Sequence, residues 1–423
     1  MAIDNKDKKV LKSSIEREQN ELACSAEREK IKGSKNLNVP HLRFPEFSGE
    51  WKKHSLGEIG ETIIGLTYKP SDVVDNNGII VFRSSNIKNG MIDYSDLVRV
   101  NKYIKDKIIT KENDILVCAR NGSQRLIGKN AIIKQEDANN TFGAFMMVYR
   151  ANDNPFILPL LSTKKYFSQV GENLGARINQ ITTSDFNGFE FYFPENHAER
   201  TKIAELFRLL DERIATQNKI IEDLKKLKSA IIEMEYTHKT KGNTHIGDFI
   251  EQTSKRNKDS AIQNVLSVSN SQGFIQQCEQ FENRSVASDD ISNYKIVERN
   301  CFAFNPARIN VGSIARLTTF NRGIVSPMYI CFRTKDNLFP EYLDYYFESK
   351  QFFTEIQKRL EGSVRQCLSY EGLCNIPLCI PTVEVQQQTG KRLSTLVQEI
   401  KLEIDFLELL QKQKKFLLHQ MFI

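Results

Sequence analysis

The sequence predicts an α+β fold in which two copies of one mixed α/β domain are joined by two long helices. Three observations lead to this fold class. A glycine-free stretch in the middle of the chain carries a heptad pattern, the same pattern returns at the end of the chain, and several sequence blocks recur at offsets of 183 to 190 residues. We expect the two helices to form an antiparallel coiled coil and the two domains to be related by pseudo-twofold symmetry.

The central helix is predicted from apolar residues that recur at alternating steps of four and three between Pro194 and Tyr236. A 3.5-residue repeat keeps one seam of a helix facing a partner helix. From Leu393 onward each seam position returns 190 residues later, although polar residues such as Gln217 and Gln411 occupy different points of the two seams. The residues assigned to helix pairing are Ile203, Phe207, Leu210, Ile214, Ile221 and Leu224, with Leu393, Val397, Ile400, Ile404 and Leu407. The apolar stripe of the central helix is widened by Leu206, Ile220, Leu227 and Met234. On the seam alone, two unrelated helices, each packed on its own domain, stay an alternative.

Sequence blocks in the first half of the chain recur in the second half. Leu56–Glu61 is echoed by Ile246–Glu251, and Gly143–Arg150 by Ser326–Arg333. Both copies end at a proline that opens a long helix, Pro194 or Pro381. A duplication whose frame is kept while its interior diverges suggests one task performed on two different targets.

The predicted organisation has five parts. Residues 1–38 are a polar extension, 39–193 the first domain, 194–236 the central helix, 237–380 the second domain and 381–423 the C-terminal helix. In the first domain the strands are expected at Ile79–Phe82, Ile115–Cys118 and Ala144–Tyr149, and a helix at Pro159–Val170. The segment 39–51, which ends at the only tryptophan, is expected to lie near the C-terminal helix.

Composition limits the classes of function. With 423 residues, 40% of them hydrophobic, the chain can bury more than one core. No apolar run is long enough to span a bilayer and the first ten residues do not form a signal peptide, so a cytoplasmic protein without a membrane role is expected. The formal net charge is +6, and no segment of the chain is polybasic. The eight cysteines form no CxxC pair, which favours reduced thiols over disulfides or a zinc site.

Motifs for catalysis are missing or incomplete. Gly122–Asn130 has five residues between its glycines where a phosphate-binding loop has four, and it lacks the Ser or Thr that holds magnesium. Asn305–Arg308 lacks the Pro-aromatic pair of an amino-methyltransferase, and Asp223–Lys225 falls on the heptad helix, where a solvated face explains it. The sequence therefore predicts no catalytic, metal-binding or cofactor-binding residue.

Loops rich in Arg, Asn, Gln and Ser occur in both copies. Arg and Lys can donate two hydrogen bonds to guanine, and Asn and Gln can pair with adenine, so such loops suit direct readout of base edges. Ordinary polar surface loops have the same composition. The candidates in the first domain are Arg83, Ser85, Asn86, Lys88, Arg120, Asn121, Ser123, Arg125, Arg177, Asn179 and Gln180. Those in the second are Lys255, Arg256, Asn305, Arg308, Asn310, Arg316, Arg322, Arg365 and Gln366.

From residue 39 to residue 423 the chain resembles the specificity subunits of type I restriction–modification systems. The resemblance is carried by Leu42–Phe47 followed by Trp51, by the paired Leu-Gly-Glu-Ile-type openings, by the Gly-to-Pro stretches that close each domain, and by the repeated helices. It implies a subunit without catalysis whose two domains each read half of a split, asymmetric site in double-stranded DNA. It also implies that the helices fix the gap and dock two methyltransferase subunits, which motor-nuclease restriction subunits join. S-adenosylmethionine, ATP and magnesium are then expected in partner subunits only.

Two further hypotheses stay open. A two-domain scaffold could hold partner proteins apart without touching DNA, and an isolated enzyme is the third reading. Half-sites about one helical turn, roughly 34 Å, apart on one face of the duplex can be addressed by two readers on a rigid rod.

Overall fold

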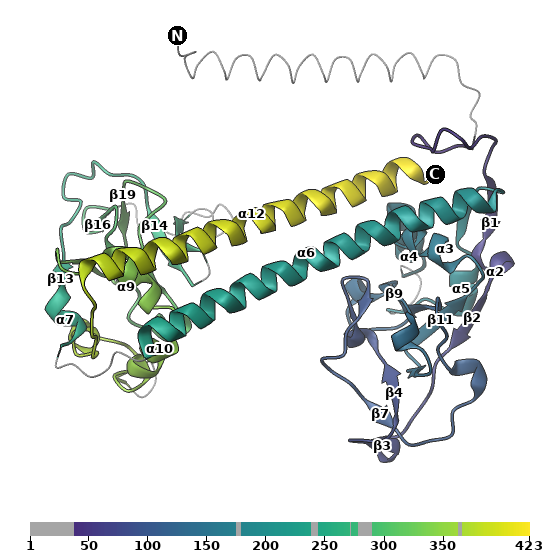
Figure 1. Ribbon diagram of the computed structural model, residues 1–423, viewed down its shortest axis with the longest axis horizontal. Helices are drawn as coiled ribbons and strands as arrows, with labels where there is room; N and C mark the ends of the chain where they lie inside the picture. The colour runs from purple at the N-terminus through teal and green to yellow at the C-terminus, as the bar shows by residue number, and fades with distance from the viewer. Residues whose placement is uncertain (1–37, 175–178, 238–243, 271, 278–289, 363–365) are drawn as a thin grey trace, which may run out of the picture. The chain divides into compact units, whose positions relative to one another are not determined.

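The computed structural model describes residues 38–174, 179–237, 244–270, 272–277, 290–362 and 366–423. The contact pattern divides the chain into two units, Met1–Ile214 with Leu409–Ile423, and Ala215–Glu408. Each unit therefore contains part of α6 (His197–Thr237) and part of α12 (Val383–Met421), the two long helices in Figure 1. The domain boundaries expected at residues 193 and 380 stay a proposal.

Within the described residues, unit 1 contains two four-stranded sheets, two two-stranded sheets and several short helices. Its strands are β1 (Lys52–Ser55), β2 (Glu61–Ile64), β3 (Val73–Val74), β4 (Ile79–Phe82), β5 (Ile87–Lys88), β6 (Met91–Ile92), β7 (Arg99–Val100), β8 (Ile115–Cys118), β9 (Asn130–Ile132), β10 (Thr141–Phe142), β11 (Met146–Arg150) and β12 (Glu190–Phe193). Its α-helices before α6 are α2 (Leu56–Ile59), α3 (Asn154–Leu160), α4 (Lys164–Leu174) and α5 (Thr183–Asn187). Its 3₁₀ helices are η1 (Pro70–Asp72), η2 (Ser84–Asn86), η3 (Asp106–Ile108), η4 (Gln124–Leu126) and η5 (Gln135–Asp137).

Unit 2 has one four-stranded sheet beside two-stranded ladders. Its strands are β13 (Ile250–Thr253), β14 (Leu266–Ser269), β15 (Gly273–Gln276), β16 (Lys295–Glu298), β17 (Phe302–Phe304), β18 (Ile314–Arg316), β19 (Arg322–Val325) and β20 (Ile330–Thr334). Its helices are α7 (Ile246–Phe249), η6 (Ile309–Val311), α9 (Pro340–Tyr346), α10 (Lys350–Gln357) and α11 (Tyr370–Cys374). The predicted mixture of sheets, short helices and long helices is thus confirmed.

The main sheets of the two units have the same strand order, which agrees with the sequence repeat. Unit 1 has the order β2-β11-β8-β9 and unit 2 the order β13-β20-β17-β18. The register agrees as well, because Arg150 lies opposite Glu61 in unit 1 and Arg333 opposite Glu251 in unit 2. These pairs are the ones that the offsets of 183 and 190 residues equate.

The core of unit 1 includes the segment before β1 and the end of α12. Trp51 is 1% exposed, and its ring centroid lies 6.3 Å from that of Phe422. The Leu42 N–H donates to the Gln420 carbonyl at 2.9 Å. Arg43 makes a two-pronged ion pair with the buried Glu199 at 2.7 and 2.8 Å, which also accepts from the Trp51 indole N–H. The expectation that this segment lies near the C-terminal helix is confirmed.

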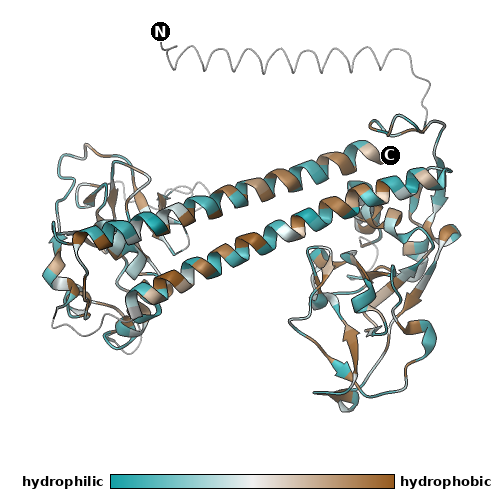
Figure 2. Cartoon of the chain, in the orientation of Figure 1, coloured by the Kyte–Doolittle hydropathy of each residue, from teal (hydrophilic) through white to brown (hydrophobic). Residues whose placement is uncertain are grey.

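Within each unit the segments of α6 and α12 run antiparallel. In unit 1, Phe207 packs on Phe422. Asp211, which lies further along α6, forms an ion pair of 2.5 Å with Lys414, which lies earlier on α12. In unit 2, Gln217 donates to the Glu403 carbonyl at 3.1 Å, and Glu235 pairs with Arg392 at 3.5 Å. Figure 2 shows apolar and hydrophilic residues interleaved along both helices.

The burial of the long helices differs in part from the predicted seam. Ile203, Phe207, Leu210, Ile221, Leu393 and Ile400 are buried, and Ile214, Leu224, Ile404 and Leu407 are half-buried. Val397, by contrast, is 38% exposed, whereas Leu410, which the heptad count omits, is 5% exposed. The stripe-widening residues Ile220, Leu227 and Met234 also face solvent. The seam therefore occupies a narrower part of each helix than the apolar residues alone suggest.

The helix predicted at Pro159–Val170 is corrected to two helices. The helix is interrupted between Leu160 and Lys164. There the Thr163 hydroxyl donates to the Leu160 carbonyl at 2.7 Å and accepts from the Tyr166 N–H at 3.3 Å. A threonine that hydrogen-bonds the backbone in this way competes with a continuous helix. The strands expected at Ile79–Phe82 and Ile115–Cys118 are confirmed, and the one expected at Ala144–Tyr149 begins at Met146.

Candidate nucleic-acid interface

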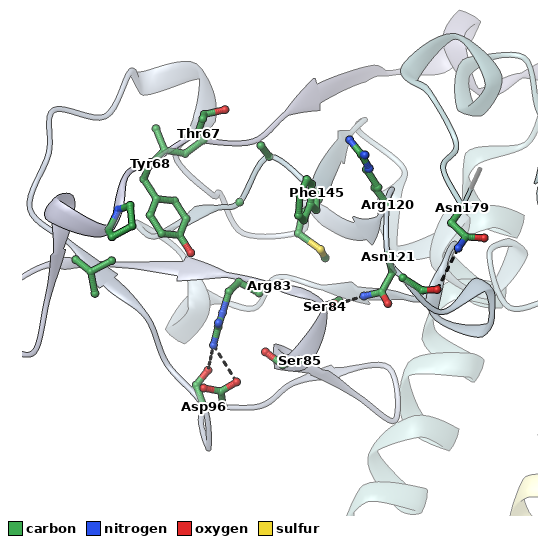
Figure 3. Close-up of a pocket in the computed structure, with 17 residues that line it drawn as sticks. Thr67, Tyr68, Arg83, Ser84, Ser85, Asp96, Arg120, Asn121, Phe145 and Asn179 are labelled. Atoms are coloured by element: carbon green, nitrogen blue, oxygen red, sulfur yellow. Dashed lines mark hydrogen bonds and ion pairs between the residues drawn. The ribbon is translucent and has the colours of Figure 1, made fainter. Parts of the chain in front are cut away.

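A cavity of about 1180 Å³ in unit 1 brings together loops that follow two strands. The loop after β4 contributes Arg83, Ser84 and Ser85, and the loop after β8 contributes Arg120, Asn121 and Gly122. Figure 3 shows these side chains around the cavity together with Thr67, Tyr68, Asp96, Phe145 and Asn179. Five residues selected from the sequence for base readout therefore line one concave surface: Arg83, Ser85, Arg120, Asn121 and Asn179.

The loop after β8 is held by hydrogen bonds to the 179 segment and to the loop after β4. The Asn179 side-chain amide donates to the Gly122 carbonyl at 3.0 Å, and the Asn121 N–H donates to the Asn179 carbonyl at 3.3 Å. The Asn121 side-chain amide donates to the Ser84 hydroxyl at 2.9 Å, as the dashed lines in Figure 3 show. Asn179 itself has a φ of 49°, a left-handed conformation that asparagine adopts more readily than most residues. The polar groups thus sit on a pre-ordered backbone.

Arg120 supplies the exposed positive charge of the cavity. Its guanidinium lies 5.3 Å from the centroid of the Phe145 ring, and its backbone N–H donates to the Phe145 carbonyl at 3.0 Å. Among the residues that the structure describes, no carboxylate lies within ion-pair distance of Arg120. A guanidinium stacked on a ring and without a counter-ion can donate hydrogen bonds to a phosphate or a guanine edge.

Arg83 is held differently. Its guanidinium pairs with the Asp96 carboxylate at 2.8 Å. Asn86 is fully buried. Its side-chain carbonyl accepts from the Arg83 backbone N–H at 2.9 Å, and its side-chain amide donates to the backbone carbonyls of Asp93 and Asp96. The selection of Asn86 as a base reader is therefore corrected, because its hydrogen-bonding groups hold the loop after β4 together.

The other candidates in the described part of unit 1 do not line the cavity. Ser123 and Arg125 are exposed, and Gln180 forms an isolated β-bridge with Arg120. Lys88 is exposed and pairs with Asp93 at 2.9 Å; hydrogen bonds from Ser95 and from Lys88 lower the pKa of that carboxyl to about 2. Arg177 lies outside the described residues.

The candidates in unit 2 divide into exposed and internally bonded side chains. Arg308, Arg322 and Lys255 are exposed, as is Arg256, which donates to the Asn293 side chain at 2.7 Å; Asn310 is half-buried and Gln366 exposed. Arg365 lies outside the described residues.

Two selections in unit 2 are corrected. Arg316 forms ion pairs with Glu341 at 3.2 Å and Asp344 at 3.1 Å, and its side chain is 13% exposed. Asn305 is buried, and its side-chain carbonyl accepts from the Ala307 backbone N–H at 3.1 Å. Both side chains bond within the unit and leave no group directed at a ligand.

Sequence reasoning omitted the aromatic lining of the cavity. Tyr68 and Phe145 line it together with the selected polar residues, and Phe145 is 61% exposed. A phenylalanine beside the apolar strand Met146–Tyr149 has the signature of a core residue in sequence. A signal was nevertheless present, since Phe145 falls in a block that recurs at Met328.

Two searches over the described residues gave no site of another kind. No group of three or more His, Cys, Asp or Glu residues in this part of the chain is placed to hold a metal ion. Nor is any helix in the described ranges both long enough and apolar enough to cross a bilayer.

Comparison with known proteins gives matches in sequence and in structure. Residues 48–226 match a family model described as the type I restriction modification DNA specificity domain. Over 194 residues the chain is 27% identical to the specificity subunit of the type I restriction enzyme EcoKI from Escherichia coli K12, and equally to that of StySPI from Salmonella potsdam. These alignments include 43% of this chain and 41% and 42% of the two relatives, so the matched part spans about two fifths of their length.

A solved structure has a similar fold over most of the chain. It is the S subunit of a type I restriction–modification system from M. genitalium, with a TM-score of 0.57 and 16% sequence identity. The superposition covers 91% of this chain and 99% of that one.

Proposed function

We propose that this chain is the DNA specificity subunit of a type I restriction–modification complex. Its similarity to such subunits in sequence and in fold supports this proposal. Each of its two units reads one half of a split, asymmetric site in double-stranded DNA. The chain contributes recognition, and catalysis belongs to its partners. We place it in the cytoplasm, where host DNA is found.

The observation that carries this proposal is the cavity of unit 1. Its lining residues run from Leu66 to Asn179 and therefore all lie within residues 48–226, which match the DNA specificity model. It combines an exposed guanidinium with side-chain amides and hydroxyls, the groups that recognise base edges and phosphates. Its backbone is fixed by hydrogen bonds, which lowers the entropy cost of binding.

The proposed contacts are the selected residues whose side chains stay available in the structure. In unit 1 these are Arg83, Ser85, Lys88, Arg120, Asn121, Ser123, Arg125, Asn179 and Gln180, and in unit 2 Lys255, Arg256, Arg308, Asn310, Arg322 and Gln366. Arg177 and Arg365 stay proposals from sequence alone. Asn86, Asn305 and Arg316 are removed because each side chain is almost withdrawn from solvent and bonds within its own unit.

We further propose that α6 and α12 form a coiled-coil spacer that fixes the distance between the half-sites, in a pseudo-twofold arrangement of the two domains. The antiparallel helix segments within each unit support this role. The same helices would dock two modification subunits through apolar residues that face solvent at heptad spacing, Ile220, Leu227 and Met234 on α6 and Leu402, Leu409 and Phe416 on α12. S-adenosylmethionine, ATP and magnesium would be bound by the modification and restriction subunits.

Selection from random duplex libraries tests the recognition role. The chain, assembled with its modification subunits, is expected to enrich a motif of two short half-sites separated by a spacer of fixed length. Replacing residues 237–380 by those of a related chain should change one half-site and leave the other unaltered. Enrichment of no motif would favour the non-DNA-binding scaffold, for which no observation in the structure speaks specifically.

The spacer role has its own test. Leu210→Asp or Ile400→Asp places a charge at a helix position that is 9% exposed, and assembly with the modification subunits is expected to be lost. Size-exclusion chromatography coupled to light scattering measures the assembly. Normal assembly of both variants would contradict the proposed role of the helices.

A further inference from the structure

The turn before the central strand of the main sheet has the same form in both units. In unit 1 the Met146 N–H donates to the Gly143 carbonyl at 2.8 Å, immediately before β11. In unit 2 the Tyr329 N–H donates to the Ser326 carbonyl at 3.0 Å, immediately before β20. These residues are related by the same offset of 183 that relates β11 to β20, so the turns occupy equivalent places in two sheets of equal strand order.

Each turn presents a large apolar side chain to solvent. Phe145 and Met328 occupy the same position of their turns, and each is 61% exposed. The next residue is buried in both, with Met146 1% and Tyr329 8% exposed. The exposed position is apolar in both copies although the turn residues before it differ, Gly-Ala in one and Ser-Pro in the other. An apolar side chain kept at one solvent-facing position in both copies is a candidate contact for a partner.

The backbone at Phe145 is held in place by hydrogen bonds. Its carbonyl accepts from both the Ala119 and the Arg120 N–H at 3.0 Å, and the neighbouring Ala144 N–H donates to the Leu66 carbonyl at 2.9 Å. The ring lines the cavity described above and lies between Tyr68 and Arg120 in the view of Figure 3. A side chain carried on a fixed backbone loses less freedom on binding, which favours specific contacts.

The surroundings of both turns favour a polyanion as the partner. Arg120 stacks on Phe145 and Arg125 lies exposed on the same loop. In unit 2, the loop that follows β17 carries the exposed Arg308, and the Asn305 amide of that loop contacts the Met328 sulfur at 3.8 Å. An apolar group among cations fits the grooves of duplex DNA, where charge neutralises phosphates and apolar atoms meet base carbons.

The kind of base contact follows from the geometry at Phe145. A ring that inserts between two base pairs needs both faces free, but the Arg120 guanidinium covers one face at 5.3 Å. The apolar feature available at a base edge in the major groove is the 5-methyl group of thymine, and phenylalanine is among the side chains that contact it. Methionine offers an equally apolar and more adaptable contact at the matching position.

We propose that Phe145 and Met328 are the thymine-reading residues of the two units, each packing on the 5-methyl group of a thymine in its own half-site. In unit 1 the Arg120 guanidinium, held beside the ring, then reads the adjacent base pair. The proposal rests on the DNA-specificity function proposed above and names a subsite within it.

Uracil substitution tests this contact because it removes only the methyl group. Once the split site has been selected, each thymine of both half-sites is replaced in turn by deoxyuridine, and affinity is measured with the chain bound to its modification subunits. We expect one position in each half-site to lose about fourfold in affinity, the equivalent of one buried methyl group. Phe145→Ala should abolish the uracil effect in one half-site only, and Met328→Ala in the other only.

Exposed phenylalanines at matched positions elsewhere in the two units provide the controls. Phe167 on α4 and Phe353 on α10 are 48% and 51% exposed and are related by an offset of 186. Phe167→Ala and Phe353→Ala should leave every uracil effect as in the unaltered chain. Phe145→Leu should keep part of the effect, because leucine preserves an apolar contact.

The outcomes separate this inference from the function on which it rests. A half-site without thymine, or a uracil effect that survives in Phe145→Ala and Met328→Ala, would overturn the inference while the selected motif still supports DNA specificity. If no motif is selected at all, the proposed function fails first.

Discussion

Units 1 and 2 share the strand order of one sheet and differ in the strands that lie beside it. The strand order and the register of the main sheets agree. Beside that sheet, unit 1 has a second four-stranded sheet, β10-β4-β7-β3, whereas unit 2 has the ladders β14-β15 and β16-β19. Even at equal register positions the side chains differ, because Ile132 of β9 stands opposite Ile115 whereas Arg316 of β18 stands opposite Phe302. A sheet of constant strand order thus supports different strands in the two units, as the proposed reading of two different half-sites requires.

The largest expected effect tests whether the two units are separate structures. Leu393→Ala opens a cavity in the core of unit 2, and Ile203→Ala does the same in unit 1, since both side chains are at most 1% exposed. Each should reduce the free energy of unfolding by about 3 kcal/mol. Hydrogen exchange followed by mass spectrometry should show faster exchange mainly in the altered unit. Equal acceleration in both units would mean that the division is wrong.

The next effect concerns the close backbone contact in unit 1 between Gly65 and the turn before β11. A Cβ at Gly65 would lie 2.3 Å from the Gly143 carbonyl oxygen and 2.4 Å from that of Phe142, so Gly65→Ala forces the backbone apart. We expect a loss of about 2 kcal/mol in urea unfolding. A Cβ at Gly122, which lines the cavity of unit 1, would meet nothing within 4 Å, so Gly122→Ala serves as the control. An unchanged urea midpoint for Gly65→Ala would show that the turn before β11 can move freely.

Arginine substitutions sharpen the comparison at the level of readout. Arg120→Ala and Arg308→Ala each remove one exposed guanidinium, so each should cost about 1.5 kcal/mol of binding free energy, roughly tenfold in affinity. The effect should relax the base preference of one half-site, a different one for each variant. Competition binding with libraries randomised in one half-site measures this. Loss of affinity without any change in base preference would reduce both residues to phosphate contacts.

The smallest expected effect depends on pH and belongs to unit 2. Burial raises the pKa of the Asp344 carboxyl, and the Arg316 guanidinium opposes that shift. Because the folded protein then holds this proton more tightly than the unfolded chain does, stability falls as the pH rises through the folded pKa. Arg316→Ala removes the opposing charge. It should therefore cost about 1 kcal/mol at pH 7 and less at pH 4. Adding Asp344→Asn should remove the pH dependence, and a loss that is equal at both pH values would contradict this account.

The long helices and the repeat could be predicted from the sequence because their signals are periodic. Heptad spacing predicts a helix over residues 194–236, which begins three residues before α6 (His197–Thr237) and ends one residue before it does. Periodicity alone does not identify the side chains that reach the partner helix, and so Val397 was assigned to the seam while Leu410 was omitted. The break at Thr163 depends on side-chain hydrogen bonds that compete with helix, which apolar spacing does not record.

The candidate site could be predicted only in part, because its residues depend on contacts between distant segments. Arg308 and Arg316 look alike in sequence, and the difference between them comes from Glu341 and Asp344, which are 25 and 28 residues away from Arg316. Asn86 and Asn121 differ in the same manner, since burial commits the first to its own loop. Composition therefore predicts which loops carry the site, and tertiary structure decides which of their side chains face outward.

The share of α12 in unit 1 has a consequence for the order in which the chain folds. Phe422 and Met421 belong to the same core as Trp51 and Phe156, so this core lacks part of its filling until residues 409–423 have left the ribosome. Every residue of unit 2, in contrast, lies between 215 and 408 and is synthesised before them. During translation the half of the molecule that is encoded first is thus the one completed last, and until then a nascent unit 1 exposes an apolar surface around Trp51.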